Sequence, residues 1–310
     1  MKRVFLIAAV LVLAGAQILS AKSWRVNNND NTANFQTLDA AMTSITAGDT
    51  LYLEGSSKVY FFTNKVTKKV TIIGPGYFLN ENPNTLTSPL SAIIDTNTIY
   101  LGAEGITIEG VVFNKSIYIE ANNVTVKRCQ FGWMSFTKNG DNMIKNAAIL
   151  QNYSFGRVVG GNAVTNSMII NNIFAENTSV INGCHNTIIE NNTCVSGFSI
   201  NGNSECTIKN NIINTLANNT NSVESNNYAA QTADFISPTG ASTDGKWQLA
   251  ANSQAMTAGS NGSQVGAFGG SSPYVLSGMP GVPHIYEIEA PTTASKESGL
   301  NIVIKIGTEK

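Results

Sequence analysis

The chain has few charged side chains: 13% of its 310 residues are Asp, Glu, Lys or Arg, where soluble domains carry about 25%. Its 19 basic and 20 acidic residues nearly cancel. Such a chain lacks the basic clusters that bind a phosphate backbone or an anionic membrane, so nucleic-acid binding is not expected. Disordered chains combine low hydrophobicity with high net charge, whereas this one has 42% hydrophobic residues and a net charge of −1.

Cysteine and histidine are also scarce, with four Cys and two His. Cys129, Cys184, Cys194 and Cys206 form no C-x-x-C pair and have no companion His cluster, so no metal site is predicted. We expect the cysteines to be small apolar residues of a core. In an exported protein, Cys184 could instead form a disulfide with Cys194 or Cys206.

Long apolar runs are absent except at the N-terminus. A basic tripeptide precedes the run from Val4 to Leu13, and Ala16 and Ala21 offer cleavage sites. This pattern predicts a secretory signal peptide over residues 1–21. The alternative, a transmembrane anchor, needs roughly 20 apolar residues, and Gln17 interrupts the run too early. We expect an exported protein, placed outside the cell, on its surface or in the periplasm, with no transmembrane segment after cleavage.

Asn supplies much of the polarity, with 39 residues, and it recurs in a repeat of about 20 residues. Each repeat has a central apolar position and a second apolar position five residues later. β-branched residues, Asn and Gly dominate these units, which favours strands and turns over helices. The central positions are Ile72, Ile108, Val126, Leu150, Ile169, Ile189 and Ile208, and the later ones are Tyr77, Phe113, Phe131, Phe155, Phe174, Cys194 and Ile213.

Two apolar columns separated by a polar turn predict the coils of a solenoid, whose strands stack about 4.8 Å apart. Asn152, Asn171, Asn191 and Asn210 occupy one turn position in four successive coils. Stacked Asn amides can bond to one another in a ladder, and Asn tolerates the left-handed backbone of a tight corner. We therefore predict a structural Asn ladder, while binding of sugar hydroxyls by these side chains stays open as an alternative.

The repeat and its Asn positions resemble the right-handed parallel β-helix of the pectate-lyase-like superfamily. Residues 34–53, a short amphipathic helix and then a strand, are similar to the opening of many exported members. Residues 70–80 and 266–278 resemble a coil and the ending of a group of exported bacterial β-helix proteins. The resemblance implies the fold. It also implies polysaccharide as a ligand class, because many relatives cleave acidic polysaccharides, the lyases with calcium held by acidic residues.

The predicted fold class is all-β, a right-handed parallel β-helix solenoid with an N-terminal capping helix and a C-terminal β-hairpin. We expect the β-helix to span residues 22–277, with the capping helix at about 34–46 and regular coils at about 50–213. An irregular final coil is predicted at 228–277, followed by a Pro-rich connector and the hairpin at 278–310.

The sequence offers few groups for catalysis. Glu109 and Glu190 fall in one outward column, but four coils apart, or roughly 19 Å at strand spacing. They are too far apart to share a calcium ion or a glycosidic bond. Lys127 and Lys209 follow in the next coils, which predicts solvated ion pairs. No catalytic motif of the resembled enzymes can be transferred to positions of this sequence. No cofactor is therefore expected, and calcium is expected only if the chain is a lyase.

Aromatic residues are better candidates for a binding site. If Ile117 and Ile119 face inward, Tyr118 faces out, and Trp133 lies on the same face one coil away, with Arg128 at its margin. Such rings stack on sugars, although burial beneath a loop is the alternative. We predict a monomeric, secreted or surface protein that binds a polysaccharide or cell-surface glycan or serves as a structural solenoid. The alternatives are a polysaccharide lyase or glycoside hydrolase and an adhesin-like interaction surface.

Overall fold

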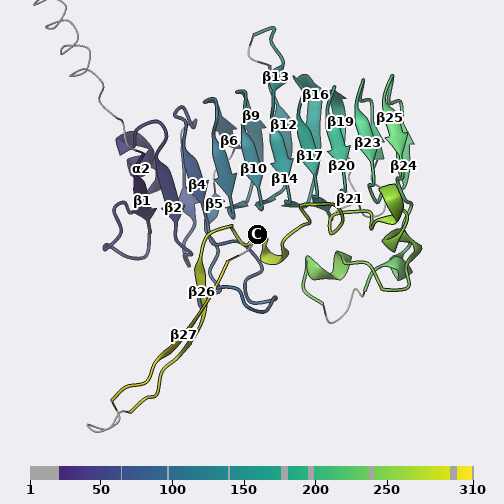
Figure 1. Cartoon of the computed structure of the whole chain (residues 1–310). Coiled ribbons are helices and arrows are strands. Elements are labelled where there is room, and N and C mark those ends of the chain that lie inside the picture. The colour runs from purple at the N-terminus through teal and green to yellow at the C-terminus, as the bar shows by residue number, and fades with distance from the viewer. Residues whose placement is uncertain are drawn as a thin grey trace, which may run out of the picture.

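The chain folds into a solenoid of short strands stacked in parallel sheets, which confirms the predicted all-β parallel β-helix (Figure 1). The computed structural model describes residues 21–63, 65–95, 98–138, 140–175, 181–194, 199–236, 241–293 and 299–308. Apart from Ala21, the predicted signal peptide lies outside these residues.

Three sheets run along the described part of the solenoid. Sheet A holds ten strands: β1 (Ser23–Val26), β2 (Thr50–Leu53), β4 (Thr71–Ile73), β7 (Thr107–Glu109), β10 (Thr125–Lys127), β14 (Ala148–Leu150), β17 (Met168–Ile170), β20 (Ile188–Glu190), β23 (Thr207–Lys209) and β25 (Val223–Ser225). Sheet B holds seven: β3 (Tyr60–Phe61), β5 (Ile93–Asp95), β8 (Val112–Phe113), β11 (Gln130–Phe131), β15 (Tyr153–Ser154), β18 (Ile173–Phe174) and β21 (Thr193–Cys194). Sheet C holds eight: β6 (Thr98–Leu101), β9 (Ser116–Ile119), β12 (Met134–Phe136), β13 (Ile144–Lys145), β16 (Val158–Thr165), β19 (Ile181–His185), β22 (Ser199–Asn201) and β24 (Thr215–Ala217).

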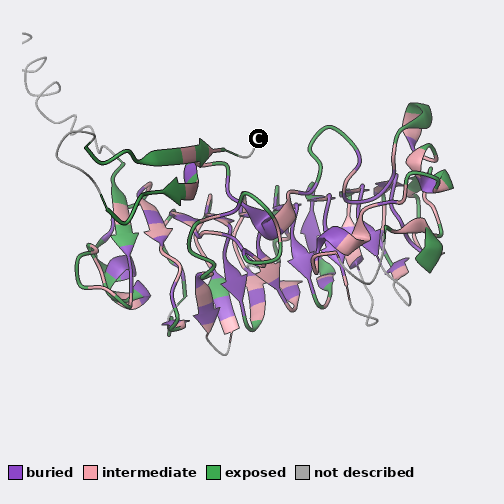
Figure 2. Ribbon diagram, turned by 90° about the horizontal axis from the view of Figure 1, so that it is seen from below, coloured by how far each residue is buried: buried purple, intermediate pink, exposed green. Residues whose placement is uncertain are grey.

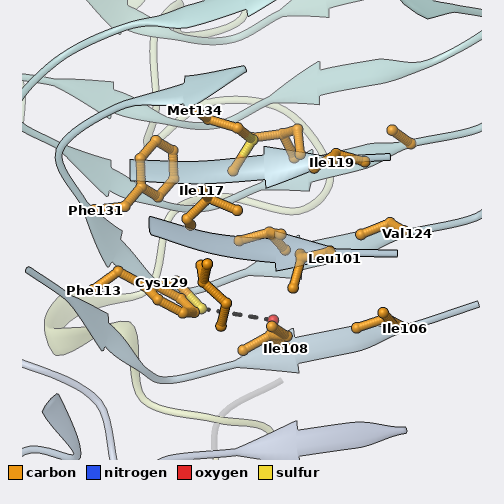
Figure 3. Close-up of a cluster of buried hydrophobic side chains, with 14 of the residues drawn as sticks. Leu101, Ile106, Ile108, Phe113, Ile117, Ile119, Val124, Cys129, Phe131 and Met134 are labelled. Atoms are coloured by element: carbon orange, nitrogen blue, oxygen red, sulfur yellow. Dashed lines mark hydrogen bonds between the residues drawn. The ribbon is translucent and has the colours of Figure 1, made fainter. Parts of the chain in front are cut away.

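The core is a stack of apolar side chains from the strands of successive coils (Figure 3). In sheet A, Ile108 pairs with Val126 and Val126 with Ile149, all fully buried. The predicted central column is therefore shifted by one residue in this coil, where Leu150 faces outward. Because residues 147–150 are all apolar, alternation cannot mark the inward face there. Because of the same shift, Ser154 and not Phe155 is the buried residue that pairs with Phe131.

A short helix covers the first coil, as the sequence predicts. Helix α2 (Leu38–Ser44) begins after Thr37, whose hydroxyl accepts a hydrogen bond from the Ala40 amide at 3.2 Å. Its buried residues Leu38, Ala41 and Met42 pack on the core. The helix is shorter than predicted, and strand β1 precedes it in the chain.

The C-terminal part differs from the predicted irregular coil. Strands β24 and β25 extend the solenoid beyond residue 213, and the segment that follows them packs Leu249, Ala255 and Val265 onto Ile212, which lies between β23 and β24. From residue 228 to residue 278 the described elements are 3₁₀ turns instead of strands: η1 (Thr232–Asp234), η2 (Gly245–Trp247), η3 (Gln254–Met256), η4 (Ser260–Gly262) and η5 (Leu276–Gly278).

Residues 260–281, which we call the strap, run back along the solenoid at the corner between sheets A and B (Figure 1). Corner side chains of several coils hold it. Asn210 accepts a hydrogen bond from the Ser260 amide at 3.0 Å, and Asn171 donates to the carbonyls of Ala267 and Gly269 at 2.7 and 2.8 Å. The strap has no periodic apolar residues of its own, and hydrogen bonds to the corners of the coils hold it in place.

The strap is also locked by a buried carboxylate. Asp244, which is 0% exposed, accepts hydrogen bonds from Asn82 Nδ2 at 3.0 Å, Tyr274 Oη at 3.1 Å and the Ser277 amide at 2.7 Å. Tyr274 in turn shares a hydrogen bond of 2.7 Å with Tyr77. Burial, followed by the charge of Asp244, holds the pKa of both tyrosines well above the usual value.

The predicted hairpin forms from the antiparallel strands β26 (His284–Glu289) and β27 (Val303–Gly307). It extends away from the solenoid, and much of it is exposed (Figures 1 and 2). Lys305 pairs with Glu287 at 2.8 Å and with Glu289 at 3.2 Å. Isoleucines such as Ile304 and Ile306, 52% and 65% exposed, lie uncovered within the described chain.

All four cysteines are free and buried, so the core placement holds and the disulfide alternative does not. Burial raises the pKa of the Cys129 thiol to about 12 and raises those of Cys184, Cys194 and Cys206. The folded chain therefore keeps thiol protons that the unfolded chain releases near its ordinary pKa of 9.0. We expect the free energy of unfolding to fall as the pH rises from about 9 toward 12. Urea unfolding at about pH 7 and about pH 10.5 measures this fall, and equal midpoints would contradict it.

Candidate functional site

The candidate site is a row of side chains on the outer face of sheet C, here called the aromatic stripe: Tyr100, Tyr118, Trp133 and Arg157. The Tyr100 and Tyr118 rings lie 5.4 Å apart between centroids, and those of Tyr118 and Trp133 lie 6.3 Å apart. The Arg157 guanidinium lies over the Trp133 ring, 4.5 Å from its centroid, in a cation–π contact. The stripe therefore crosses four successive coils.

Strand alternation places these rings outside. Ile117 and Ile119 are fully buried, so Tyr118 between them must face outward. Tyr100 pairs directly with Tyr118 across the strands β6 and β9. Trp133 and Arg157 immediately precede β12 and β16, so they form the adjacent outward column.

The stripe is open enough to be reached. Tyr100 is 39% exposed, Tyr118 and Trp133 are partly exposed, and Arg157 is exposed. These side chains are therefore not buried beneath a loop. The indole Nε1 of Trp133, however, is shielded from water and has no hydrogen-bond partner in the described chain. A buried donor of this kind usually has an acceptor. The Trp133 end of the stripe therefore has an unmet hydrogen-bond requirement among the described residues.

Polar side chains continue the same face beyond the rings. Ser135 pairs with Tyr118, and Asn182 and Asn201 pair with each other in later coils of the same column. Hydroxyl and amide groups next to an aromatic surface are the usual lining of sites that orient a small polar ligand. Geometrically, the face combines a stacking platform with hydrogen-bonding groups.

Two stripe residues were predicted from the sequence and two were missed. Tyr118 and Trp133 lie together as expected. Tyr100 was missed, although the sequence from Thr98 to Leu101 has the same form as β9, 18 residues later. Arg157 was missed because its place beside Trp133 depends on the register of β12 and β16.

Arg128 does not flank the stripe, so its predicted position is wrong. Its side chain is 1% exposed and lies at the corner between sheets A and B. Arg128 Nε donates to Gln151 Oε1 at 3.0 Å, Nη1 donates to the Met279 carbonyl at 2.9 Å, and Nη1 lies 3.5 Å from a carboxylate oxygen of Glu109. A left-handed φ of 51° turns this residue out of the strand alternation. Its guanidinium anchors the strap.

The Asn ladder exists, but it runs through a different column from the predicted one. Asn152 Nδ2 donates to Asn172 Oδ1 at 2.9 Å. The series of hydrogen bonds between side-chain amides continues through Asn192, Asn211 and Asn227 at 2.9, 3.0 and 2.9 Å. Asn171, Asn191 and Asn210 occupy the preceding position, with φ of 56°, 52° and 56°. The sequence does not separate the two columns, because both positions carry Asn in three coils. The one-residue shift near Leu150 places Asn152 in the ladder column, and not in the column of Asn171, Asn191 and Asn210.

The acidic side chains form ion pairs. Lys127 Nζ lies 3.8 Å from Glu109 and Lys209 Nζ lies 3.4 Å from Glu190, which confirms the predicted pairs. His185 bonds to Ser204 Oγ at 3.0 Å and lies 3.5 Å from Glu205, whose side chain is 56% exposed. Water screens the latter contact, so it orients His185 weakly.

The described residues contain no group of three or more His, Cys, Asp or Glu that could hold a metal ion. No helix among them is long and apolar enough to cross a membrane.

No protein-family model and no curated protein sequence matches the chain. Solved structures similar to it include a rhamnogalacturonan lyase, with 12% identity over 70% of this chain and a TM-score of 0.33. The match spans 65% of that lyase's own length. Another is pectate lyase Pel9A, with 14% identity over 83% of this chain and 96% of that chain, again with a TM-score of 0.33.

Proposed function

We propose that the protein binds the sugar rings of a polysaccharide or cell-surface glycan along the aromatic stripe. The supporting observation is the row of tilted rings of Tyr100, Tyr118 and Trp133, with centroids 5.4 and 6.3 Å apart on an accessible sheet face. Aromatic faces present flat apolar area against which the C–H face of a pyranose packs. The exposed guanidinium of Arg157 adds a donor suited to a uronate carboxylate.

The place of action is part of the same proposal. The N-terminal signal pattern supports export, which would bring the stripe into contact with glycans outside the cell or in the periplasm. A monomer fits, because one chain contains the whole stripe.

The test is binding of the mature chain to pectins, alginates and host glycans, with and without calcium. We expect Tyr118→Ala or Trp133→Ala to weaken binding about 3–10-fold, and the double variant about 10–100-fold, since each ring contributes on the order of 1 kcal/mol. Isothermal titration calorimetry on the best ligand measures these changes.

The matched control is Phe61→Ala, which removes another exposed ring, 66% exposed on sheet B, and should leave binding unchanged. Equal affinities of the stripe variants and the natural chain would refute the proposal. Cleaved products in the same assay would assign the enzyme alternative instead.

A further inference from the structure

A pocket of about 290 Å³ lies on the other side of the solenoid, between the outer face of sheet A and the strap. We call it the corner pocket. Its walls include Leu150, Met168, Ile170, Glu190, Asn191 and Ser271. The aromatic stripe lies on sheet C, so the two surfaces share no residue.

One wall of the corner pocket is apolar. Leu150 pairs with Ile170 in the outward column of sheet A, at positions that hold Lys127 and Glu190 in the flanking coils. Met168 is 40% exposed beside them. Apolar side chains thus replace the ion-paired ones in two coils beside the strap.

The opposite wall contains an amide without a partner. Asn191 is 4% exposed, and its Oδ1 is shielded and accepts no hydrogen bond in the described chain. The equivalent corner residues Asn171 and Asn210 both bond to the strap. At Gly270, where φ is +75°, an added Cβ would lie 2.3 Å from the Asn191 amide nitrogen, so the strap approaches this side chain as closely as a glycine allows.

Glu190 places a second acceptor in the pocket. Its Oε1 receives Asn210 Nδ2 at 3.2 Å and faces Lys209 Nζ at 3.4 Å, so the local charge is balanced. A balanced site disfavours a lone cation or anion and suits a neutral ligand with hydroxyl groups. The terminal torsion of an Asn side chain is broad, so a small rotation turns Oδ1 toward such a donor.

We propose that the corner pocket binds one neutral pyranose unit, with the C–H face of the sugar on Leu150, Met168 and Ile170 and a hydroxyl group donating to Asn191 Oδ1. The volume of about 290 Å³ lies just below the usual range of ligand sites, about 300–1,000 Å³, so it suits one ring and not a chain. This is a second sugar site, independent of the aromatic stripe.

The test is methyl NMR on the mature chain carrying ¹³C-labelled Met, Ile and Leu methyl groups, titrated with methyl β-D-glucopyranoside and methyl β-D-galactopyranoside. Saturable shifts are expected at Met168 and Ile170 for at least one probe. Asn191→Gly keeps the left-handed corner and removes the amide, and it should weaken binding at least about 10-fold, equivalent to about 1.4 kcal/mol. Asn226→Gly makes the same change at another corner residue, with φ of 53°, and should have no effect.

Failure of this site is separable from failure of the stripe. The shifts at Met168 should persist in Tyr118→Ala, because that ring lies on another sheet. Absence of saturable shifts with both probes, or equal affinity in Asn191→Gly and Asn226→Gly, would overturn the proposal and leave a water-filled pocket. Shifts that vanish in Tyr118→Ala but persist in Asn191→Gly would also overturn it and assign the binding to the stripe alone.

Discussion

Replacing Asn172 by Ala is expected to lower the free energy of unfolding by about 3–5 kcal/mol. Asn172 is 0% exposed in the middle of the Asn ladder. Its Oδ1 accepts from the amide and side chain of Asn152, both at 2.9 Å, and its Nδ2 donates to Asn192 and to the Ile149 carbonyl, also at 2.9 Å. Alanine removes these hydrogen bonds and leaves the buried Asn152 amide without its acceptor, while Asn152 Nδ2 keeps the Val126 carbonyl and Asn192 Oδ1 keeps the backbone amide of residue 172. A buried donor without a partner costs more than the hydrogen bond itself stabilises.

Urea unfolding followed by circular dichroism measures the effect. The control is the exposed Asn114→Ala, which should change stability by less than about 0.5 kcal/mol. A loss in Asn172→Ala no larger than in the control would mean that the ladder contributes little beyond the strands it joins.

Replacing Asp244 by Ala is expected to release the strap and cost about 3–4 kcal/mol. The substitution removes the shared acceptor of the half-buried Asn82 amide, the buried Tyr274 hydroxyl and the Ser277 amide, although Asn82 Nδ2 keeps Ser277 Oγ at 2.9 Å. Because the Tyr274 hydroxyl also holds Tyr77, the contact between strap and solenoid weakens at both rings.

Limited proteolysis distinguishes this release from general unfolding. Cleavage of Asp244→Ala should begin within residues 260–281 while the coils stay protected. Asp141→Ala, which removes an exposed carboxylate, is the control and should behave as the natural chain. An uncut strap in Asp244→Ala would show that the corner side chains alone suffice to hold it.

Much of the fold follows from the sequence because each coil repeats the same physical pattern. An apolar residue every 20 or so positions, followed by Asn, predicts the strands of sheet A and their corner. The prediction fails by one residue at Leu150, where a run of apolar residues removes the contrast between the two faces of a strand. It fails more completely for the strap, whose order comes from hydrogen bonds to corners such as Asn171 and not from its own pattern.

The site was partly predictable for the same reason. Alternation about buried Ile117 and Ile119 is sufficient to place Tyr118 outside, since a strand has only two faces. Arg128 shows the limit of that rule, because the residue directly after β10 has a left-handed backbone and no longer alternates. Its 1% exposure depends on Met279 in the strap, a contact 151 residues away in the sequence.

The strap changes how the solenoid should come apart. A stack of repeats held only by nearest neighbours can fray from either end, one coil at a time. Here Ser277 Oγ bonds to the Phe78 carbonyl, 199 residues earlier, while Ser260 bonds to the late-coil residue Asn210. The strap therefore adds contacts between residues far apart in the sequence to the nearest-neighbour contacts of the coils. The strap links an early coil to the late ones, and this coupling favours all-or-none unfolding over fraying from the end.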